Sequence, residues 1–196
     1  MAGTDASAAD GTALLIIDMI NDLRFEEATA ILPAVRAAAE AIVTLRAAAD
    51  AHDVPVIYVN DNYGQWHSER SRLIERALEQ AGDNRDLIRG IVPRDRDLFV
   101  IKPQFSGFYA TNLPVVLPRL GVRRLILTGI AADICVLFTA ADAHMRDYAL
   151  WVPGDTVAGL SADRTRWALE IMETSMKADI RPTTVRRLDD WLGAAS

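Results

Sequence analysis

Short apolar runs alternate with longer helical segments over most of the chain, and this alternation constrains the fold more than any other feature. Four of the runs are almost continuously apolar, which is typical of strands covered on both faces of a parallel sheet. The last run is more polar, so we expect it to form an edge strand. The runs expected to form strands are residues 13–18, 55–60, 98–102, 124–129, 149–153 and 183–188.

The segments between these runs are predicted to be helical, at residues 31–50, 68–81, 133–146 and 162–177. Alternating strands and helices predict a parallel sheet with helices on both faces, connected by right-handed crossovers. No internal repeat or Pro/Gly/Ser-rich linker divides the 196 residues, a length that suits one domain. We therefore predict a tail at residues 1–10 and a single doubly wound α/β domain at residues 11–196. This domain would be a Rossmann-like three-layer sandwich around a mainly parallel, six-stranded sheet.

The charge and the single cysteine narrow the choice of partners and environment. The formal net charge is −6 and no run of Lys or Arg is present, which argues against a nucleic-acid or membrane partner. Cys135 alone cannot form an intramolecular disulfide. The first ten residues are polar and alanine-rich, without the basic and apolar regions of a signal peptide. The next apolar run contains Asp18 and is too short to span a bilayer, so we expect a cytoplasmic protein.

Several common binding and catalytic motifs are missing from the sequence. The first predicted strand leads into IIDMINDL rather than G-x-G-x-x-G, and neither a P-loop nor a G-x-S-x-G elbow occurs. The histidines His52, His67 and His144 are far apart and show no metal-ligand spacing. Surface or packing roles are favoured for all three, and we expect neither a metal nor another cofactor.

Three polar side chains stand at the ends of predicted strands. Asp18 ends the first, Lys102 ends the third, and Cys135 follows the fourth. Sites in parallel α/β sheets form beyond the carboxyl ends of the strands, where a carboxylate, an ammonium and a thiol together could perform nucleophilic catalysis. Taken singly, the aspartate could cap a loop, the lysine could be solvated, and the cysteine could be a buried structural thiol.

The segment TGIAADICV favours a reactive cysteine. Gly129 and the small residues Ala131 and Ala132 suit a tight turn out of the strand, and Asp133 could cap the helix that follows. Cys135 would then lie in the first turn of that helix. The positive end of a helix dipole stabilises a thiolate, so we predict a lowered pKa for the cysteine.

Three segments of the chain resemble the signatures of the isochorismatase-like cysteine hydrolases: DMINDL, KPQFSGFYATNL and TGIAADICV. This superfamily includes nicotinamidases, carbamoylsarcosine amidohydrolases and ureidoacrylate amidohydrolases. The resemblance implies a catalytic triad of Asp18, Lys102 and Cys135. It also implies a cis peptide between Ile130 and Ala131, which would present the N–H groups of Ala131 and Cys135 as an oxyanion hole.

The resemblance further implies hydrolysis of a small amide or carbamoyl substrate through a thioester. Amide and aromatic side chains follow the second and third predicted strands, where a substrate pocket is expected, and two apolar residues match pocket-wall positions of the family. Alternatives are a structured loop with Trp66 packed beneath it and a core position for Phe105. The residues expected to line the pocket are Leu23, Asn60, Asn62, Tyr63, Trp66, Phe105, Tyr109 and Ile134.

Nicotinamidases bind a metal through an Asp-x-His pair and a further histidine after the second strand. In the corresponding segment VNDNYGQWHS, Asp61 stands at the position of the aspartate, Tyr63 stands in place of the histidine, and His67 lies nearby. The sequence therefore favours a metal-independent amidohydrolase.

Two other functions stay open from the sequence. True isochorismatases cleave a vinyl ether and generally lack the cysteine, so Cys135 favours amide chemistry without excluding that reaction. A non-catalytic α/β module that binds a small molecule is the third alternative. Family members commonly assemble as dimers or larger oligomers, and the apolar, alanine-rich helices predict a homo-oligomer here.

Overall fold

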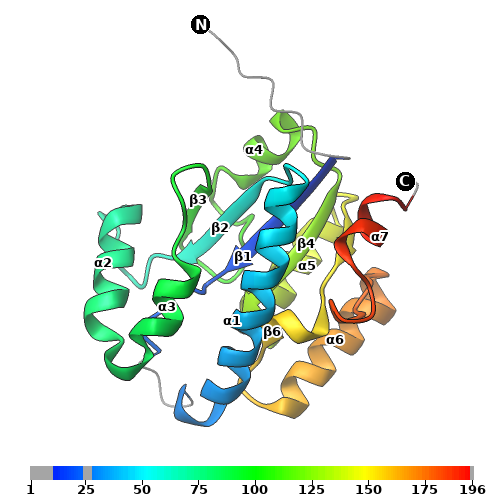
Figure 1. Cartoon of the computed structure of the whole chain (residues 1–196). Helices are drawn as coiled ribbons and strands as arrows, with labels where there is room; N and C mark the ends of the chain where they lie inside the picture. Colours follow the sequence, from blue (N-terminus) through cyan, green and yellow to red (C-terminus); the bar gives the residue numbers. More distant parts are fainter. Residues whose placement is uncertain (1–10, 24–27, 195–196) are drawn as a thin grey trace, which may run out of the picture.

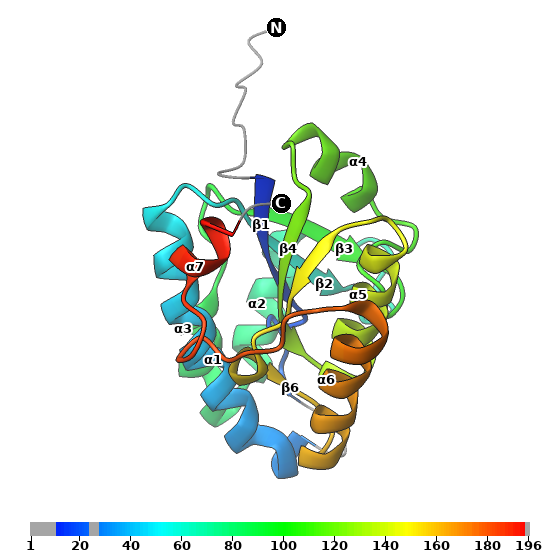
Figure 2. The same ribbon diagram turned by 90° about the vertical axis from the view of Figure 1, so that its right-hand side faces the viewer.

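The computed structural model describes residues 11–23 and 28–194. A parallel sheet lies between two layers of helices (Figure 1, Figure 2). The strand order is β3-β2-β1-β4-β5, β6 pairs with β4, and all these pairings are parallel, which confirms the predicted doubly wound α/β fold. The strands are β1 (Thr12–Ile17), β2 (Val56–Asp61), β3 (Leu98–Lys102), β4 (Arg124–Ile130), β5 (Ala149–Trp151) and β6 (Val157–Ala158).

The helices of the two layers bury separate apolar surfaces against the sheet. They are α1 (Ala28–Ala51), α2 (Arg70–Gln80), α3 (Arg85–Ile91), α4 (Leu113–Arg119), α5 (Leu137–His144), α6 (Ala162–Met176) and α7 (Leu188–Leu192). Residues of α1, α2, α3 and α7 belong to one core cluster, and residues of α4, α5 and α6 belong to the other. Figure 2 shows the sheet nearly edge-on, with α1 on one side of it and α5 and α6 on the opposite side.

The sequence of β1, TALLII, explains its central place in the sheet. All six residues are buried, and alternate side chains point to opposite faces. Leu14 and Ile16 therefore join the core beside α1, whereas Leu15 and Ile17 join the core beside α5. Because neither face of β1 meets water, the polar Asp18 that follows is held at the carboxyl edge of a rigid strand.

Helix α1 is long and apolar enough to cross a membrane, as judged by its length and composition alone. Its buried residues recur at helical spacing, among them Ile31, Val35, Ile42 and Leu45, and they belong to the core that covers the sheet. Its other face is exposed at positions such as Glu40. In this structure α1 therefore has the features of a core helix.

The prediction of an edge strand at residues 183–188 is wrong. The backbone N–H and the hydroxyl of Thr183 both donate to the carboxylate of Asp155, at 2.9 and 2.5 Å, so neither is free to pair with a strand. The N–H groups of Val185 and Arg186 donate to the carbonyl of Pro182 and form a turn that leads into α7. The sixth strand is instead β6, which pairs with the end of β4.

Candidate active site

The carboxyl ends of β1, β3 and β4 bring Asp18, Lys102 and Cys135 together. The Lys102 ammonium lies 2.8 Å from the Asp18 carboxylate and 3.4 Å from the Cys135 sulfur. The lysine side chain is fully buried, and only 7% of the Asp18 side chain is exposed. The structure therefore places within hydrogen-bonding range the three residues that the strand ends of the sequence pointed to.

Two further groups hold the Lys102 ammonium. The Asp61 carboxylate lies 3.2 Å away, and the carbonyl of Gln104 accepts a hydrogen bond of 3.1 Å from Nζ. Burial opposes the charge of Lys102, but the interaction with Asp18, followed by those with Cys135 and Asp61, outweighs it and raises the lysine pKa. The ammonium is therefore a permanent positive charge beside the sulfur.

Asp18 has a fixed orientation toward these partners. Its backbone adopts the left-handed conformation, with φ 52°, and one carboxylate oxygen accepts a hydrogen bond of 2.7 Å from the N–H of Asp61. The Cys135 thiol is hydrogen-bonded to the same carboxylate. Burial raises the Asp18 pKa, and Lys102 partly offsets this effect. A carboxylate with a raised pKa that contacts a thiol is suited to accept its proton.

The pKa of Cys135 differs from the sequence-based prediction. Burial, together with the negative charge of Asp18, raises it to about 12, although Lys102 acts in the opposite direction. The expectation of a lowered pKa is therefore wrong for the resting protein, because desolvation and the neighbouring carboxylate outweigh any helix dipole. A thiol with this pKa is neutral at neutral pH.

The turn that carries the cysteine begins at a glycine without room for a side chain. Gly129 has φ 112°, and a Cβ placed there would lie 2.0 Å from the carbonyl oxygen of Ile17. The Ile130–Ala131 peptide that follows is cis. The carbonyl of Ala131 then accepts hydrogen bonds from the N–H groups of Ile134 and Val136, which closes a π-helical turn, Ala132–Val136, around Cys135.

Asp133 does not cap this turn, contrary to the prediction. The residue at the N-cap position is Ala131, and it has no side-chain cap. Asp133 accepts a hydrogen bond of 3.1 Å from the N–H of Leu160 and forms an ion pair with Arg164 of α6. It therefore ties the cysteine turn to α6, a long-range role that the local sequence does not reveal.

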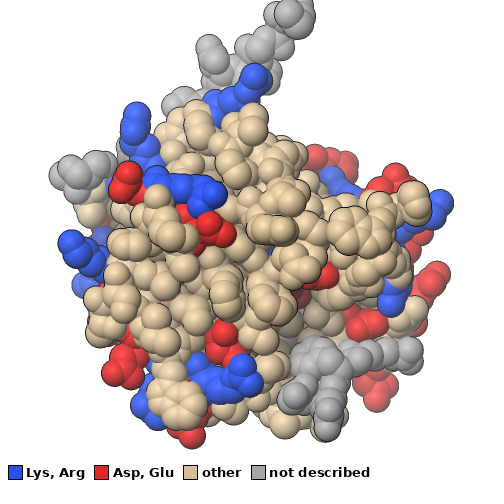
Figure 3. Space-filling model, turned by 180° about the vertical axis from the view of Figure 1, so that it is seen from behind, with Lys and Arg blue, Asp and Glu red and all other residues tan. Residues whose placement is uncertain are grey.

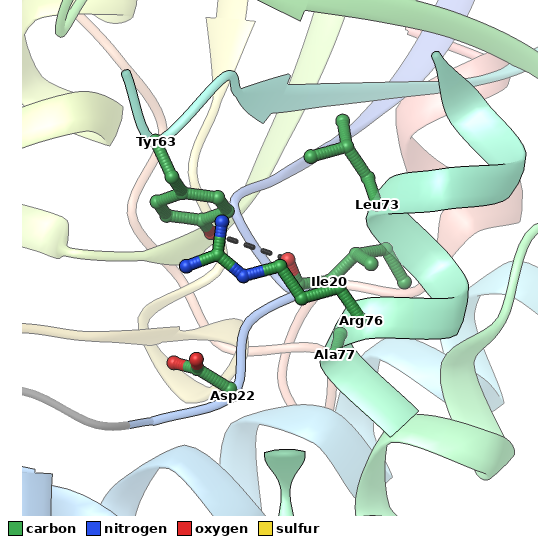
Figure 4. A pocket seen from close by; sticks show the side chains of 6 residues that line it. All are labelled: Ile20, Asp22, Tyr63, Leu73, Arg76 and Ala77. Atoms are coloured by element: carbon green, nitrogen blue, oxygen red, sulfur yellow. Dashed lines mark hydrogen bonds between the residues drawn. The ribbon is translucent and has the colours of Figure 1, made fainter. Parts of the chain in front are cut away.

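Two cavities lie close to these strand ends. One has a volume of about 190 Å³ and is lined by residues that include Ile20 and Tyr63 (Figure 4). The other has a volume of about 620 Å³ and is lined by Trp66, Phe105 and Tyr109, which the sequence placed in the pocket, and by other residues that include Phe138. Trp66 is 76% exposed rather than packed beneath its loop, and Phe105 is half exposed, so neither has the core position considered as an alternative.

The remaining predicted pocket residues do not line these two cavities. Asn60 is buried and exchanges hydrogen bonds with the backbone of Ile20, and the Asn62 side chain accepts a bond from the N–H of Gly64. Leu23 is buried in the core, and Ile134 is partly exposed in the cysteine turn. The two asparagines thus shape the loops around the site.

Sequence reasoning missed several residues of the site. Asp61 was considered only as a metal ligand, although it ends β2 directly beside Lys102 in the parallel register, which is the signal that could have found it. Phe138 lies one helical turn after Cys135, and its ring contacts that of Phe105 at 5.6 Å between centroids. Arg76 of α2 lines the smaller cavity, and no motif in the sequence marks it.

The residues at the position of the nicotinamidase metal do not fit a metal centre. Asp61 contacts the ammonium of Lys102, the histidine of the pair is replaced by Tyr63, and His67 is exposed. Within residues 11–23 and 28–194, no group of three or more His, Cys, Asp or Glu side chains is arranged to hold a metal ion.

The comparisons with known proteins agree with this geometry. The family model Isochorismatase domain matches residues 12–184. The isochorismatase family protein YaaI of Bacillus subtilis is 39% identical over 168 residues, which cover 86% of this chain and 92% of YaaI. The ureidoacrylate amidohydrolase RutB of Methylorubrum extorquens is 28% identical over 169 residues, covering 71% and 66% of the two chains.

Solved structures with a similar fold include proteins of the same family. An isochorismatase family protein from Desulfovibrio vulgaris has a TM-score of 0.73 at 26% identity and covers 94% of this chain and 99% of its own. The N-carbamoylsarcosine amidase of Thermoplasma acidophilum has a TM-score of 0.67 at 26% identity, and the match covers 88% of this chain and 96% of the amidase chain. This chain therefore belongs to the isochorismatase family of hydrolases.

Proposed function

We propose that this protein is a metal-independent cysteine amidohydrolase that cleaves a C–N bond of a small amide or carbamoyl compound. The observation that carries the proposal is the position of one buried ammonium, 2.8 Å from the Asp18 carboxylate and 3.4 Å from the Cys135 sulfur. The names of two relatives, a ureidoacrylate amidohydrolase and an N-carbamoylsarcosine amidase, support amide chemistry.

In the first half of the reaction, Asp18 takes the thiol proton as the Cys135 sulfur attacks the carbonyl carbon of the substrate. The ammonium of Lys102 stabilises the developing thiolate. The N–H groups of Ala131 and Cys135 hold the oxyanion of the tetrahedral intermediate, an interaction whose loss typically costs about 100-fold or more in rate. The C–N bond then breaks, and the amine or ammonia leaves with the proton from Asp18.

In the second half, Asp18 is again a carboxylate and activates a water molecule. The water attacks the thioester carbon and releases the acid, and the sulfur regains its proton through Asp18. The raised pKa values of Asp18 and Cys135 support this cycle, because one proton can be exchanged between them without leaving the buried site.

Ammonia release across a panel of small amides, ureido acids and nicotinamide tests the proposal. We expect at least one of these compounds to be hydrolysed by the wild type and not by Cys135→Ala. Hydrolysis of a vinyl ether that persists in Cys135→Ser, without release of ammonia from any amide, would instead assign the isochorismatase reaction. A protein that binds compounds of the panel and hydrolyses none would be the non-catalytic module.

The reactivity of the thiol gives an independent prediction. Asp18→Asn is expected to lower the Cys135 pKa, because it removes the negative charge that raises it and keeps Lys102. Since a lower pKa means more thiolate at pH 8, alkylation by iodoacetamide should become about 10-fold faster or more, even though hydrolysis is lost. Asp61→Asn, which removes the other carboxylate beside Lys102, is the matched control. An unchanged or slower reaction in Asp18→Asn would contradict the proposed contact.

We also propose that the protein is a homo-oligomer. Figure 3 shows that uncharged residues fill the middle of the face opposite to that of Figure 1, which is the side of α4, α5 and α6. Large exposed apolar side chains on these elements include Val115, Phe138, Trp167 and Ile171, and such patches mark interaction surfaces.

Sedimentation velocity is expected to show a dimer or larger species, and Phe138→Glu should shift it toward the monomer. A wild type that sediments as a monomer at micromolar concentration would refute this proposal.

A further inference from the structure

The cavity of about 190 Å³ is lined by one arginine and one aspartate as well as by apolar and aromatic side chains (Figure 4). Ile20 and Asp22 come from the loop after β1, and Tyr63 comes from the loop after β2. Leu73, Arg76 and Ala77 come from α2. A cavity of this size accommodates a small group of atoms rather than a large ligand.

The loops after β1 and β2 contribute both to this cavity and to the hydrogen bonds around Asp18. The N–H of Asp61 donates to the Asp18 carboxylate, and the N–H of Tyr63 donates to the Asp61 carboxylate at 2.7 Å. The Tyr63 hydroxyl donates to the carbonyl of Ile20, two residues after Asp18, at 3.2 Å (Figure 4). The loops that orient Asp18 and Asp61 therefore also form part of this cavity.

Arg76 reaches across the cavity from α2 toward the ring of Tyr63 (Figure 4). Its Nη1 atom is buried and has no hydrogen-bond partner among the residues that the structure describes. A guanidinium remains charged at all relevant pH values and offers five N–H donors in a planar fork. A buried donor without a partner is costly, so an acceptor oxygen placed in the cavity would gain a hydrogen bond from this atom.

A cation near the site would favour binding of an anionic substrate. The ammonium of Lys102 already faces two carboxylates, those of Asp18 and Asp61. These groups together carry an excess of negative charge, which repels an anionic substrate. Arg76 supplies the opposite charge at the adjacent cavity, in the geometry that matches a carboxylate.

We propose that Arg76 binds a carboxylate of the substrate, so that the preferred substrates are small amide or carbamoyl compounds that also carry a carboxylate. This inference rests on the proposed function and adds the substrate class to it. Asp22 lines the same cavity, and on this proposal we expect its carboxylate to compete with that of the substrate for the guanidinium. The five donors of the arginine allow it to serve both.

Two probes that differ in the carboxylate test the inference: 3-ureidopropionate and n-propylurea. Binding of each to the Cys135→Ala protein is measured by calorimetry, so that the result does not depend on turnover. We expect 3-ureidopropionate to bind at least 10-fold more tightly than n-propylurea. Arg76→Gln should weaken binding of the carboxylate by about 10- to 100-fold and leave binding of n-propylurea unchanged.

The matched control is Arg72→Gln, because Arg72 lies on the same helix with its side chain 72% exposed. This change should leave the preference for the carboxylate intact, whereas Asp22→Asn should increase it. Equal binding of the two probes, or a preference that survives Arg76→Gln, would overturn the inference. If the wild type hydrolyses no amide but these binding results hold, the proposed reaction fails and the carboxylate site stands.

Discussion

Cys135→Ala is expected to reduce kcat by at least about 10⁴-fold on any amide that the wild type hydrolyses, because the sulfur is the atom that forms the covalent bond. Stopped assays of ammonia release with purified protein measure this loss. The sequence contains no other cysteine, so no second thiol can replace it. Intact-protein mass spectrometry of the wild type, quenched in acid during turnover, should show the mass of an acyl group that is absent from the variant.

The fold should survive this change, which makes the loss of activity interpretable. The Cys135 side chain is partly exposed, and alanine removes only the sulfur atom, so a shift in Tm of a few degrees at most is expected. Cys135→Ser is the matched variant, because it keeps a hydroxyl near the position of the thiol. Turnover that is undiminished in Cys135→Ala would eliminate the proposed mechanism.

Lys102→Met is expected to destabilise the protein by about 3–5 kcal/mol as well as to inactivate it. The lysine is fully buried, and its removal leaves the carboxylates of Asp18 and Asp61 without their shared counter-ion. In the wild type Lys102 lowers the pKa of Asp18, so the pKa of Asp18 should be higher in Lys102→Met. Urea denaturation at several pH values measures the free energy of unfolding.

The loss of stability in Lys102→Met should depend on pH in a direction that follows from the Asp18 pKa. An aspartate whose pKa is higher in the folded than in the unfolded protein binds more protons when folded, so stability falls as the pH rises through the folded pKa. The deficit of Lys102→Met relative to the wild type should therefore be larger at pH 8 than at pH 5. Lys177→Met, at an exposed position after α6, is the control and should change stability little. A deficit that is equal at both pH values would contradict the role assigned to Lys102.

Much of the fold follows from local sequence patterns. The five strands β1 to β5 were predicted because buried parallel strands are short and almost wholly apolar, a pattern that needs no knowledge of the tertiary structure. Residues 183–188 have strand-like residues but lack a neighbouring strand, since Asp155 occupies the hydrogen-bonding groups of Thr183. That contact joins positions 28 residues apart, and no local pattern encodes it.

Some residues of the candidate site could likewise be predicted from the sequence, whereas other features of the site could not. Asp18, Lys102 and Cys135 could be found because parallel strands place their carboxyl ends at one edge, so that position in a strand gives position in space. The pKa of Cys135 could not be predicted, since burial and the distance to Asp18 depend on how the loops pack. Arg76 lies on a charged surface helix, and only the path of the chain after β2 brings it to the cavity.

The glycine at position 129 has a consequence for how new specificities can arise. Because the Ile17 carbonyl occupies the space of a side chain there, the strand that leads to Asp18 and the strand that leads to Cys135 meet in a backbone contact that no larger residue would allow. The walls of the smaller cavity, by contrast, come from α2 and from two loops that are not part of that contact. Swapping those segments between relatives should thus exchange what is cleaved while preserving how it is cleaved.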